Sequence, residues 1–176
     1  MADTHGLVEP QTFVFGDDGL VPNNRLPVLR YRLAVDVAGN EPERILENLF
    51  AANGWVDLWH NGIFDYLHYH ATVHEALGIA RGHAKVRLGG DRGTTLELVA
   101  GDVVILPAGT GHQCLSASDD FSVVGAYPPG EKMQITKPTP DNYRKALKTI
   151  PIVPRPVIDP VQGTQGALMR LWKTVN

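Results

Sequence analysis

Between residues 55 and 127 the sequence alternates short apolar runs with clusters of turn-forming residues, and this rhythm constrains the fold more than any other feature. The separating clusters, such as Asn61-Gly62 and Gly101-Asp102, consist of residues that favour tight turns. Short strands at regular spacing indicate an all-β sandwich or barrel, and eight of them suit a jelly roll, in which two sheets fold onto one another. The expected strands cover residues 55–59, 64–70, 73–81, 84–88, 95–99, 103–106, 113–117 and 121–127.

The residues before this region predict two more strands and one helix. Residues 12–15 are apolar and precede a turn signal, and residues 25–37 alternate apolar with polar side chains, as in a half-buried strand. Residues 41–52 carry an apolar stripe at helical spacing. Asn40 is the expected N-cap of this helix, and Gly54 marks its end.

The residues after this region are rich in proline, which lacks the N–H group that a central strand needs. We therefore expect an irregular extension with one short helix over about residues 139–150. The chain is predicted to be a single domain over residues 1–176. Its parts are an N-terminal arm with strands and a helix over 1–54, a barrel core over about 55–127 and a Pro-rich C-terminal extension over 128–176.

Composition and charge exclude several classes of protein. A hydrophobic content of 43% and a charged content of 20% are ordinary for a soluble globular chain. A net charge of −3 provides no basic surface for nucleic acid or an anionic membrane, and no apolar run approaches the ~20 residues of a membrane span. The start of the chain does not resemble a signal peptide, and Cys114 has no second cysteine for an internal disulfide. We expect a cytoplasmic protein without nucleic-acid or membrane partners.

The residues with the clearest chemistry are three histidines and a glutamate within eight positions, namely His68, His70, His74 and Glu75. Neutral imidazole nitrogen and carboxylate oxygen are ligands that Zn, Fe, Ni and Mn accept. His68 and His70 are two positions apart, so on a strand their side chains point to the same face. After a short turn, Glu75 can return beside this pair from the neighbouring strand.

A second stretch, residues 101–116, supplies one more histidine, His112. Gly109 and Gly111 let the chain turn sharply just before it, and the following strand then fixes the direction of the His112 side chain. In an antiparallel barrel, the two stretches can meet across one cavity.

Together the two stretches resemble the paired sequence motifs of the cupin superfamily. The first motif is Gly, five residues, His-x-His, three or four residues, Glu, six residues, Gly. This chain matches it with Gly62, His68, His70, Glu75 and Gly82.

The second cupin motif is Gly, five residues, Pro-x-Gly, two residues, His, three residues, Asn. This chain matches it with Gly101, Pro107, Gly109 and His112, whereas Ser116 stands where the family has Asn. The motifs cover about the middle third of the chain. More narrowly, the run HYHxxxHE, the sequence AYPPG and the final pattern DPxxGxxGxLxxLW resemble the small bacterial YjlB-like cupins, which have no settled activity.

The resemblance implies a cupin barrel, also called a double-stranded β-helix, with a metal held by His68, His70, Glu75 and His112. It implies one divalent transition metal (Fe, Mn, Ni or Zn) with one or two coordination positions open, as in catalytic sites. We therefore expect a metal-dependent enzyme that acts on a small polar organic molecule. Dioxygenase-type oxidoreductase and isomerase chemistry are both compatible with these residues, which identify no further catalytic residue and no organic cofactor site.

The alternative is a non-catalytic cupin that binds a small ligand or metal for sensing or storage, since a fold alone does not settle function. In either case we expect a homodimer, both from the resemblance and because the two flanking segments are too apolar to be free tails.

Strand alternation makes predictions for two residues near Glu75. It points His74 away from Glu75, toward the outer face or an interface, unless a bulge between residues 71 and 74 turns it inward beside the ligands. It places Arg81 on the same inward face as Glu75.

Three further residues have two interpretations each. Tyr66 shares a face with His68 and His70 and is either a cavity hydroxyl or a barrel aromatic residue. Cys114 lies two residues past the last histidine and either faces the cavity or, as we favour, is a small buried hydrophobic residue. Trp59 is expected in the core or at an interface rather than as a platform for a ligand.

Overall fold

The structure is a computed structural model that describes residues 7–173, and it is built mainly from β-strands. The start of the expected N-terminal arm, residues 1–6, lies outside the described residues. The strands of the described part are β1 (Gln11–Phe15), β2 (Asn24–Tyr31), β3 (Val56–Asn61), β4 (Glu75–Arg81), β5 (His83–Leu88), β6 (Thr94–Val99), β7 (Val103–Leu106), β8 (His112–Ala117) and β9 (Ser122–Tyr127). The helices are α1 (Pro42–Ala52), α2 (Pro140–Thr149), the short 3-10 helix η1 (Ile150–Ile152) and α3 (Ala167–Leu171).

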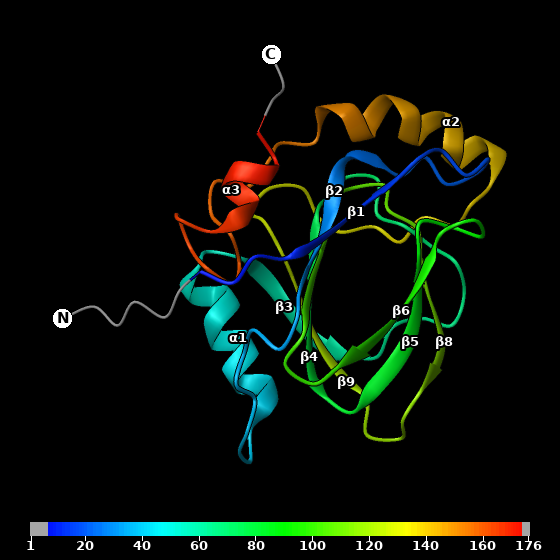
Figure 1. Ribbon diagram of the computed structural model, residues 1–176. Helices are drawn as coiled ribbons and strands as arrows, with labels where there is room; N and C mark the ends of the chain where they lie inside the picture. The colour runs from blue at the N-terminus through cyan, green and yellow to red at the C-terminus, as the bar shows by residue number, and fades with distance from the viewer. Residues whose placement is uncertain (1–6, 174–176) are drawn as a thin grey trace.

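The strands form two antiparallel sheets that enclose an apolar core (Figure 1). The larger sheet has the order β1-β2-β7-β4-β9-β3 and the smaller sheet the order β6-β5-β8. Leu77 and Ile79 of β4 meet Val86 and Leu88 of β5 in the core cluster between the sheets. Many neighbours in each sheet are distant in sequence, as in a jelly roll, and the all-β jelly-roll prediction is confirmed.

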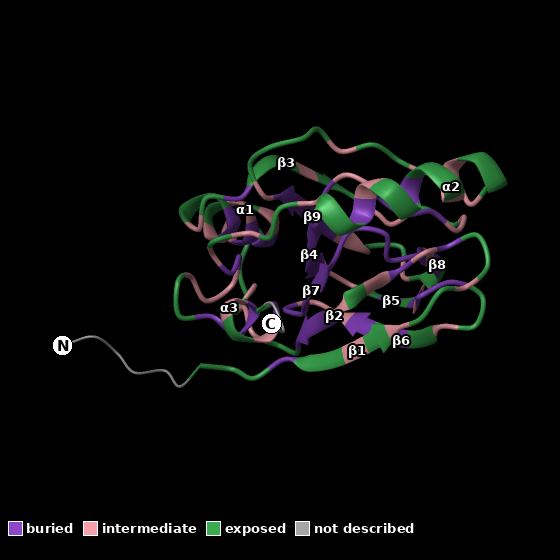
Figure 2. Cartoon of the chain, turned by 90° about the horizontal axis from the view of Figure 1, so that it is seen from above, coloured by how far each residue is buried: buried purple, intermediate pink, exposed green. Residues whose placement is uncertain are grey.

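The opposite face of the larger sheet is covered by α1 and α3, so its central strands are buried on both sides (Figure 2). Ala76 and Ala80 of β4 pack with Leu46 and Phe50 of α1. Gly78 lies between these alanines, and a Cβ atom there would lie 2.8 Å from Leu46 Cδ2. The missing side chain at this position therefore lets the helix approach the sheet closely.

Most elements lie where the sequence pattern predicts them. Strand β7 covers the predicted residues 103–106, and α1 begins one residue inside the predicted range 41–52. The Pro-rich extension contains the predicted short helix as α2, which Thr139 caps through its side chain. Turn chemistry and apolar periodicity therefore account for the strand order along the chain.

The structure contradicts the prediction of a strand over residues 64–70. This stretch is irregular, and only His68 and Tyr69 form isolated β-bridges. Leu67 and Tyr69, which indicated a strand, instead pack with Val21, Ala146 and Ile150 in a separate apolar cluster. A period of two therefore marks buried contacts here without marking a paired strand.

The predictions for residues 25–37 and for the start of α1 are partly wrong. Strand β2 ends at Tyr31, because Leu33 adopts a left-handed φ of 47° and donates its N–H to Asp102 instead of to a neighbouring strand. Glu41, and not Asn40, is the N-cap of α1, and it forms no side-chain capping bond.

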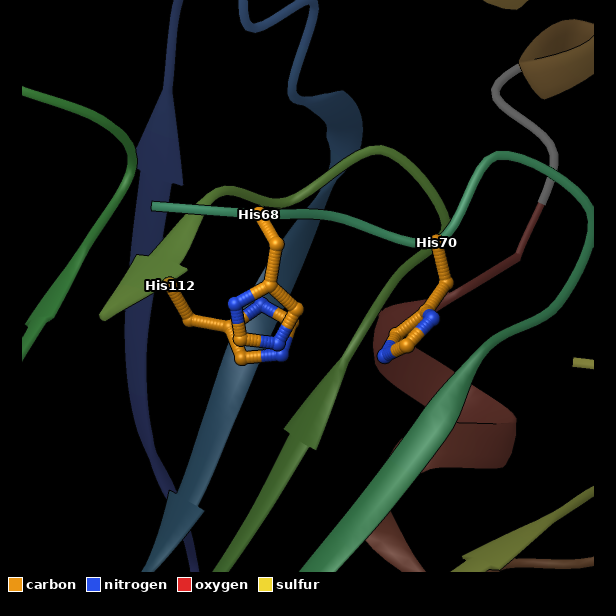
Figure 3. Close-up of side chains that lie close together, drawn as sticks. All are labelled: His68, His70 and His112. Atoms are coloured by element: carbon orange, nitrogen blue, oxygen red, sulfur yellow. The ribbon is translucent and has the colours of Figure 1, made fainter. Parts of the chain in front are cut away.

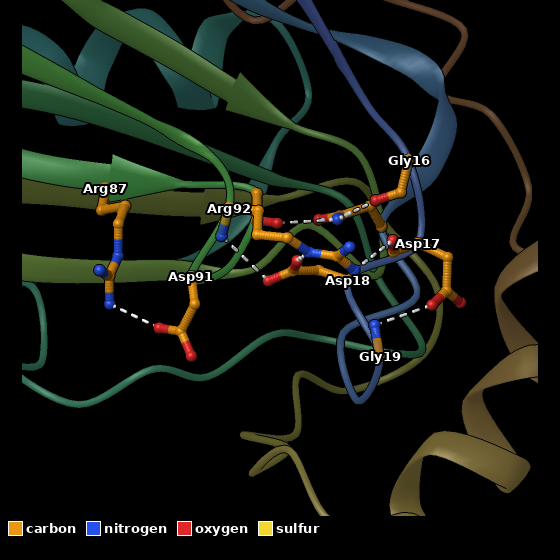
Figure 4. A network of polar contacts seen from close by, with 9 residues as sticks. Gly16, Asp17, Asp18, Gly19, Arg87, Asp91 and Arg92 are labelled. Atoms are coloured by element: carbon orange, nitrogen blue, oxygen red, sulfur yellow. Dashed lines mark hydrogen bonds and ion pairs between the residues drawn. The ribbon is translucent and has the colours of Figure 1, made fainter.

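A polar network ties the turn over residues 16–19 to the hairpin between β5 and β6 (Figure 4). Arg92 Nε lies 2.5 Å from Asp18 Oδ1. Burial opposes the ionisation of Asp18, but its hydrogen bonds with Arg92 hold the pKa of this carboxyl below its ordinary value. Within the same hairpin, Gly89 donates its N–H to the Gly111 carbonyl at 2.7 Å, so the network supports the loop that leads to His112.

The C-terminal extension is fixed to the barrel through Asp159, whose side chain is fully buried. Its carboxylate accepts hydrogen bonds from the Tyr31 hydroxyl and from the backbone N–H groups of Val161, Gln162 and Leu168. Burial, together with this hydrogen bond, raises the pKa of Tyr31, so the phenol remains a donor. The extension therefore packs on its own chain. None of the helices formed by residues 7–173 has the length and apolar character needed to span a bilayer.

Candidate metal centre

Backbone hydrogen bonds bring the two halves of the centre together. His68 belongs to the irregular stretch before β4, and His112 is the first residue of β8. The His68 N–H donates to the His112 carbonyl at 3.2 Å, and the His112 N–H donates to the His68 carbonyl at 2.9 Å. This reciprocal pair places the two ring centroids 4.1 Å apart, and His70 and Glu75 complete the group.

The three imidazoles are oriented by hydrogen bonds from the ring nitrogen that faces away from the centre. His68 Nδ1 lies 2.9 Å from the Tyr66 carbonyl, His70 Nδ1 lies 2.9 Å from the Gln134 carbonyl, and His112 Nδ1 lies 3.0 Å from the Thr110 carbonyl. A carbonyl only accepts, so each Nδ1 carries a proton and each neutral ring has its lone pair on Nε2. This is the tautomer in which Nε2 is free to bind a metal ion.

One nitrogen from each of His68, His70 and His112 lies within 4.8 Å of the other two, and Figure 3 shows the three rings turned toward a common space. All three side chains are buried. Glu75 Oε2 lies 3.2 Å from His70 Nε2 and 3.3 Å from His112 Nε2. The centre thus gathers three nitrogen lone pairs and a carboxylate oxygen.

Glu75 shows that this centre requires a positive charge. Its side chain is buried, and Oε2 has no hydrogen-bond donor within the described residues. Burial opposes ionisation, but the neighbouring imidazoles of His70 and His112 hold the pKa of Glu75 far below its ordinary value. A buried carboxylate without a donor is costly unless a cation, either a proton or a metal ion, lies between it and the imidazoles. The donor set therefore fits a divalent transition metal.

The pKa values of the histidines follow from the same surroundings. Burial, followed by the charge of His112, lowers the pKa of His68 to about 3, so this ring stays neutral. Burial also opposes protonation of His70, but the Glu75 carboxylate outweighs it and raises the pKa of His70.

Two residues that support the centre were not identified from the sequence as part of it. The Tyr127 hydroxyl donates to Glu75 Oε1 at 3.0 Å and accepts from Trp59 Nε1 at 2.7 Å. Burial, followed by the charge of Glu75, raises the pKa of Tyr127, which keeps the hydroxyl protonated as a donor. A Cβ atom at Gly125 would lie 2.1 Å from the indole, so this glycine lets Trp59 lie against β9. The glycine in a buried strand was the available signal for this contact.

A pocket of about 210 Å³ opens beside the centre and reaches the surface. His68, His70, Glu75 and His112 lie in its wall, so part of the coordination sphere of a bound ion would face the pocket. Its remaining lining residues are Trp59, His60, Asn61, Gly62, Ile63, Phe64, Leu77, Tyr127, Met133 and Ile135.

The candidates beside the ligands lie in different places. Tyr66 is half-buried and stacks on Phe64, with ring centroids 4.9 Å apart, and it contributes its backbone carbonyl to His68. Cys114 is buried in the core between the sheets, as the favoured interpretation predicts. Ser116, at the position where the family has Asn, is exposed on β8.

His74 is not one of the three clustered histidines, and its side chain packs against Trp172 of the C-terminal extension. Only 1% of its surface is accessible, because its ring packs 4.8 Å from the ring of Trp172. The backbone N–H of Ala108 donates to its Nδ1 at 2.9 Å. Burial lowers the pKa of His74 to about 4, so the ring is neutral.

The expected inward orientation of Arg81 is wrong. Its guanidinium lies outside the barrel, where Nε is 2.8 Å from Glu43 Oε1 of α1. The register between β4 and β9 shifts between Ile79 and Arg81, and such a bulge moves the following side chain to the opposite face. The centre therefore has no arginine from this strand.

The two-sheet barrel and the two histidine-bearing motifs define the chain as a cupin. No family model matches it. It is 36% identical over 165 residues to the uncharacterized protein YjlB of Bacillus subtilis (strain 168), and the match covers 93% of this chain and 97% of that protein. The chain belongs to the YjlB family of cupins.

Solved structures that are similar to the chain include two enzymes. Acireductone dioxygenase from Bacillus anthracis, described with a cadmium ion in its active center, has a TM-score of 0.42 and 18% identity, covering 60% of this chain and 80% of that one. A variant of oxalate decarboxylase from Bacillus subtilis has a TM-score of 0.38 and 15% identity, covering 81% of this chain and 34% of that one.

Proposed function

We propose that this protein is a metal-dependent enzyme that binds one divalent transition metal through His68, His70, Glu75 and His112 and acts on a small organic molecule. The observation that carries the proposal is that one ring nitrogen from each of three histidines lies within 4.8 Å of the other two, and that two of these rings adjoin a buried Glu75 oxygen with no donor. The centre lies in the wall of a pocket, which is where a substrate would reach an open coordination position.

Each residue of the centre has a defined task in this proposal. His68, His70 and His112 would offer Nε2, and their Nδ1–H bonds to backbone carbonyls fix the ring directions. Glu75 would offer Oε2, while Tyr127 holds Oε1. When bound, the metal supplies Lewis acidity or redox chemistry to a substrate oxygen or to O2. Fe, Mn, Ni and Zn all suit this ligand set.

The pocket favours dioxygenase-type over isomerase-type chemistry. Isomerisation by proton transfer requires a positioned acid or base with a free proton site facing the substrate. Among the described lining residues, the Tyr127 hydroxyl is engaged by Glu75 and Trp59, and His60 lies exposed on β3. The walls therefore lack a buried free base, whereas an oxidation at the metal needs none from the walls.

Metal analysis and oxygen consumption test this proposal. Protein purified without chelators or nickel affinity media should contain about one transition metal ion per chain. His112→Ala should lose this metal ion, because the variant lacks the imidazole nitrogen that lies beside Glu75 Oε2. Full occupancy in this variant would refute the ligand assignment. Oxygen uptake with a panel of small organic substrates should depend on the bound metal.

The alternative is a non-catalytic cupin that binds a small ligand or metal for sensing or storage. It predicts ligand-dependent changes at the metal without turnover of any substrate. A cytoplasmic location stays a prediction. So does the homodimer, and its original reason has weakened, since Leu168 and Trp172 of the C-terminal extension are buried on their own barrel and need no partner.

A further inference from the structure

The walls of the pocket carry no charge of their own to pair with a charged substrate. Among the described residues that line it, none is Lys or Arg, and the only acidic one is Glu75. The apolar residues that line it include Leu77, Ile63, Phe64 and Met133. A charged group placed against these side chains would lose its water without gaining a partner.

The polar atoms of the two aromatic walls are already used. The Trp59 indole N–H donates to the Tyr127 hydroxyl, which in turn donates to Glu75. These residues therefore present ring carbon to the pocket. Asn61 and His60 add polar groups only where the pocket meets solvent, since both are exposed, and Asn61 Oδ1 already accepts from a backbone N–H.

The net charge of the centre limits the charge of the ligand group that binds the metal. A divalent ion and the single carboxylate of Glu75 together carry one net positive charge, because the three imidazoles are neutral. One monoanionic oxygen group balances that charge. A second anionic group would remain unpaired in the apolar part of the pocket.

The size of the pocket limits the ligand further. Its volume of about 210 Å³ lies below the roughly 300–1,000 Å³ of pockets for drug-sized ligands. Phe64 and Ile135, which are 44% and 42% exposed, stand where the pocket opens to solvent. A ligand of this size is surrounded mainly by carbon and meets polar partners only at the metal and at the mouth of the pocket.

We propose that the substrate is a small molecule with one monoanionic, oxygen-bearing end that binds the metal and an uncharged, apolar body that fills the pocket. This inference rests on the proposed metal-dependent function, and it narrows the expected small polar molecule to one whose polarity is confined to a single end. Dicarboxylates, amino acids and sugars are excluded by the same contacts, since each brings a second charge or several hydroxyl groups to walls without partners.

Two hydroxamates that share one metal-binding head test the inference. Hexanohydroxamate carries an apolar tail, and succinic acid monohydroxamate carries a carboxylate on a tail with the same total number of non-hydrogen atoms. Full-length protein loaded with Co(II) should bind the first at least about tenfold more tightly, measured by calorimetry and by the change in the visible Co(II) absorption. Equal binding, or tighter binding of the carboxylate form, would overturn the inference while leaving metal binding intact.

A variant at the mouth of the pocket separates wall contacts from the metal itself. Ile135→Lys places a cation beside the tail, so it should reduce the preference for hexanohydroxamate by about tenfold or more. Ile152→Lys is the matched control at a position that is 77% exposed and does not line the pocket, and it should leave the preference unchanged. An unaltered preference in Ile135→Lys contradicts the proposed wall contact. Failure of the protein to take up Co(II) overturns the metal-dependent function itself.

Discussion

The hydrogen bond between Tyr127 and Glu75 is the contact whose loss is most informative. Tyr127→Phe removes one hydroxyl and keeps the ring that packs in the pocket wall. Glu75 Oε1 loses the donor at 3.0 Å, and Trp59 Nε1 loses its acceptor at 2.7 Å. The carboxylate is then no longer held in the orientation that directs Oε2 toward the imidazoles.

The magnitude follows from these two hydrogen bonds. A bond to a charged group contributes about 1.5–3 kcal/mol and a neutral one about 0.5–1.5 kcal/mol, so the metal-free Tyr127→Phe protein should lose about 2–4 kcal/mol of unfolding free energy. For a chain of 176 residues this corresponds to a fall in Tm of roughly 4–16 °C. Loss of an outer partner of a metal ligand typically costs about 10–100-fold in metal affinity.

Competition with a chelator of known affinity measures the change in metal affinity. Thermal unfolding of the metal-free protein measures the change in unfolding free energy. Tyr66→Phe is the matched control, because the contact of Tyr66 with His68 uses the backbone carbonyl, which phenylalanine retains. It should change stability by less than about 0.5 kcal/mol. If Tyr127→Phe binds metal as tightly as the unmodified protein, Tyr127 does not orient Glu75 and the reasoning fails.

Three further substitutions test packing and polar contacts outside the metal centre. Gly78→Ala should lower the unfolding free energy by about 1–3 kcal/mol in urea denaturation, because its Cβ would lie 2.8 Å from a side chain of α1, whereas Gly16→Ala, in open space, should change it by less than about 0.5 kcal/mol. Asp159→Asn should cost about 1–3 kcal/mol and speed proteolysis of the C-terminal extension, because an amide nitrogen cannot accept from the α3 N–H group; an unchanged cleavage rate would show that this contact does not fix the extension. The hydrogen bond from Arg81 lowers the pKa of Glu43 to about 2. Because the pair is partly exposed, it contributes less than about 1 kcal/mol to the free energy of unfolding. This contribution is present above the ordinary pKa of 4.5 and is lost as the pH falls toward 2. In Arg81→Ala an NMR titration should show the pKa of Glu43 returning toward 4.5, and a value that stays near 2 would exclude the arginine as its cause.

The sequence predicts the barrel because its turns and its strands use different residues. Gly101 and Gly109 have φ values of 95° and 89°, which residues with a side chain rarely adopt. These two glycines therefore mark turns. The all-apolar run of β7 is buried on both faces, and its bounds were predicted without error. The four candidate metal ligands were predicted from their chemistry and from the resemblance of the two stretches to the cupin motifs.

The rest of the site depends on contacts that cannot be predicted from the identity of any single residue. Leu67 and Tyr69 indicate a strand, because side chains that pack in an apolar cluster and those of a paired strand are both buried. Arg81 changes face because of a one-residue register shift, which no periodicity reveals. Trp59 and Tyr127 lie 68 positions apart and meet only because β3 and β9 are neighbours in the sheet.

The reciprocal main-chain bonds between His68 and His112 have a consequence for how such proteins diversify. They fix the separation of two ligand-bearing Cα atoms without using either imidazole. An exchange of either side chain therefore alters the donor chemistry while the spacing persists. Single substitutions can in this way change which ion a protein with this barrel binds, or remove metal binding, while the fold stays the same.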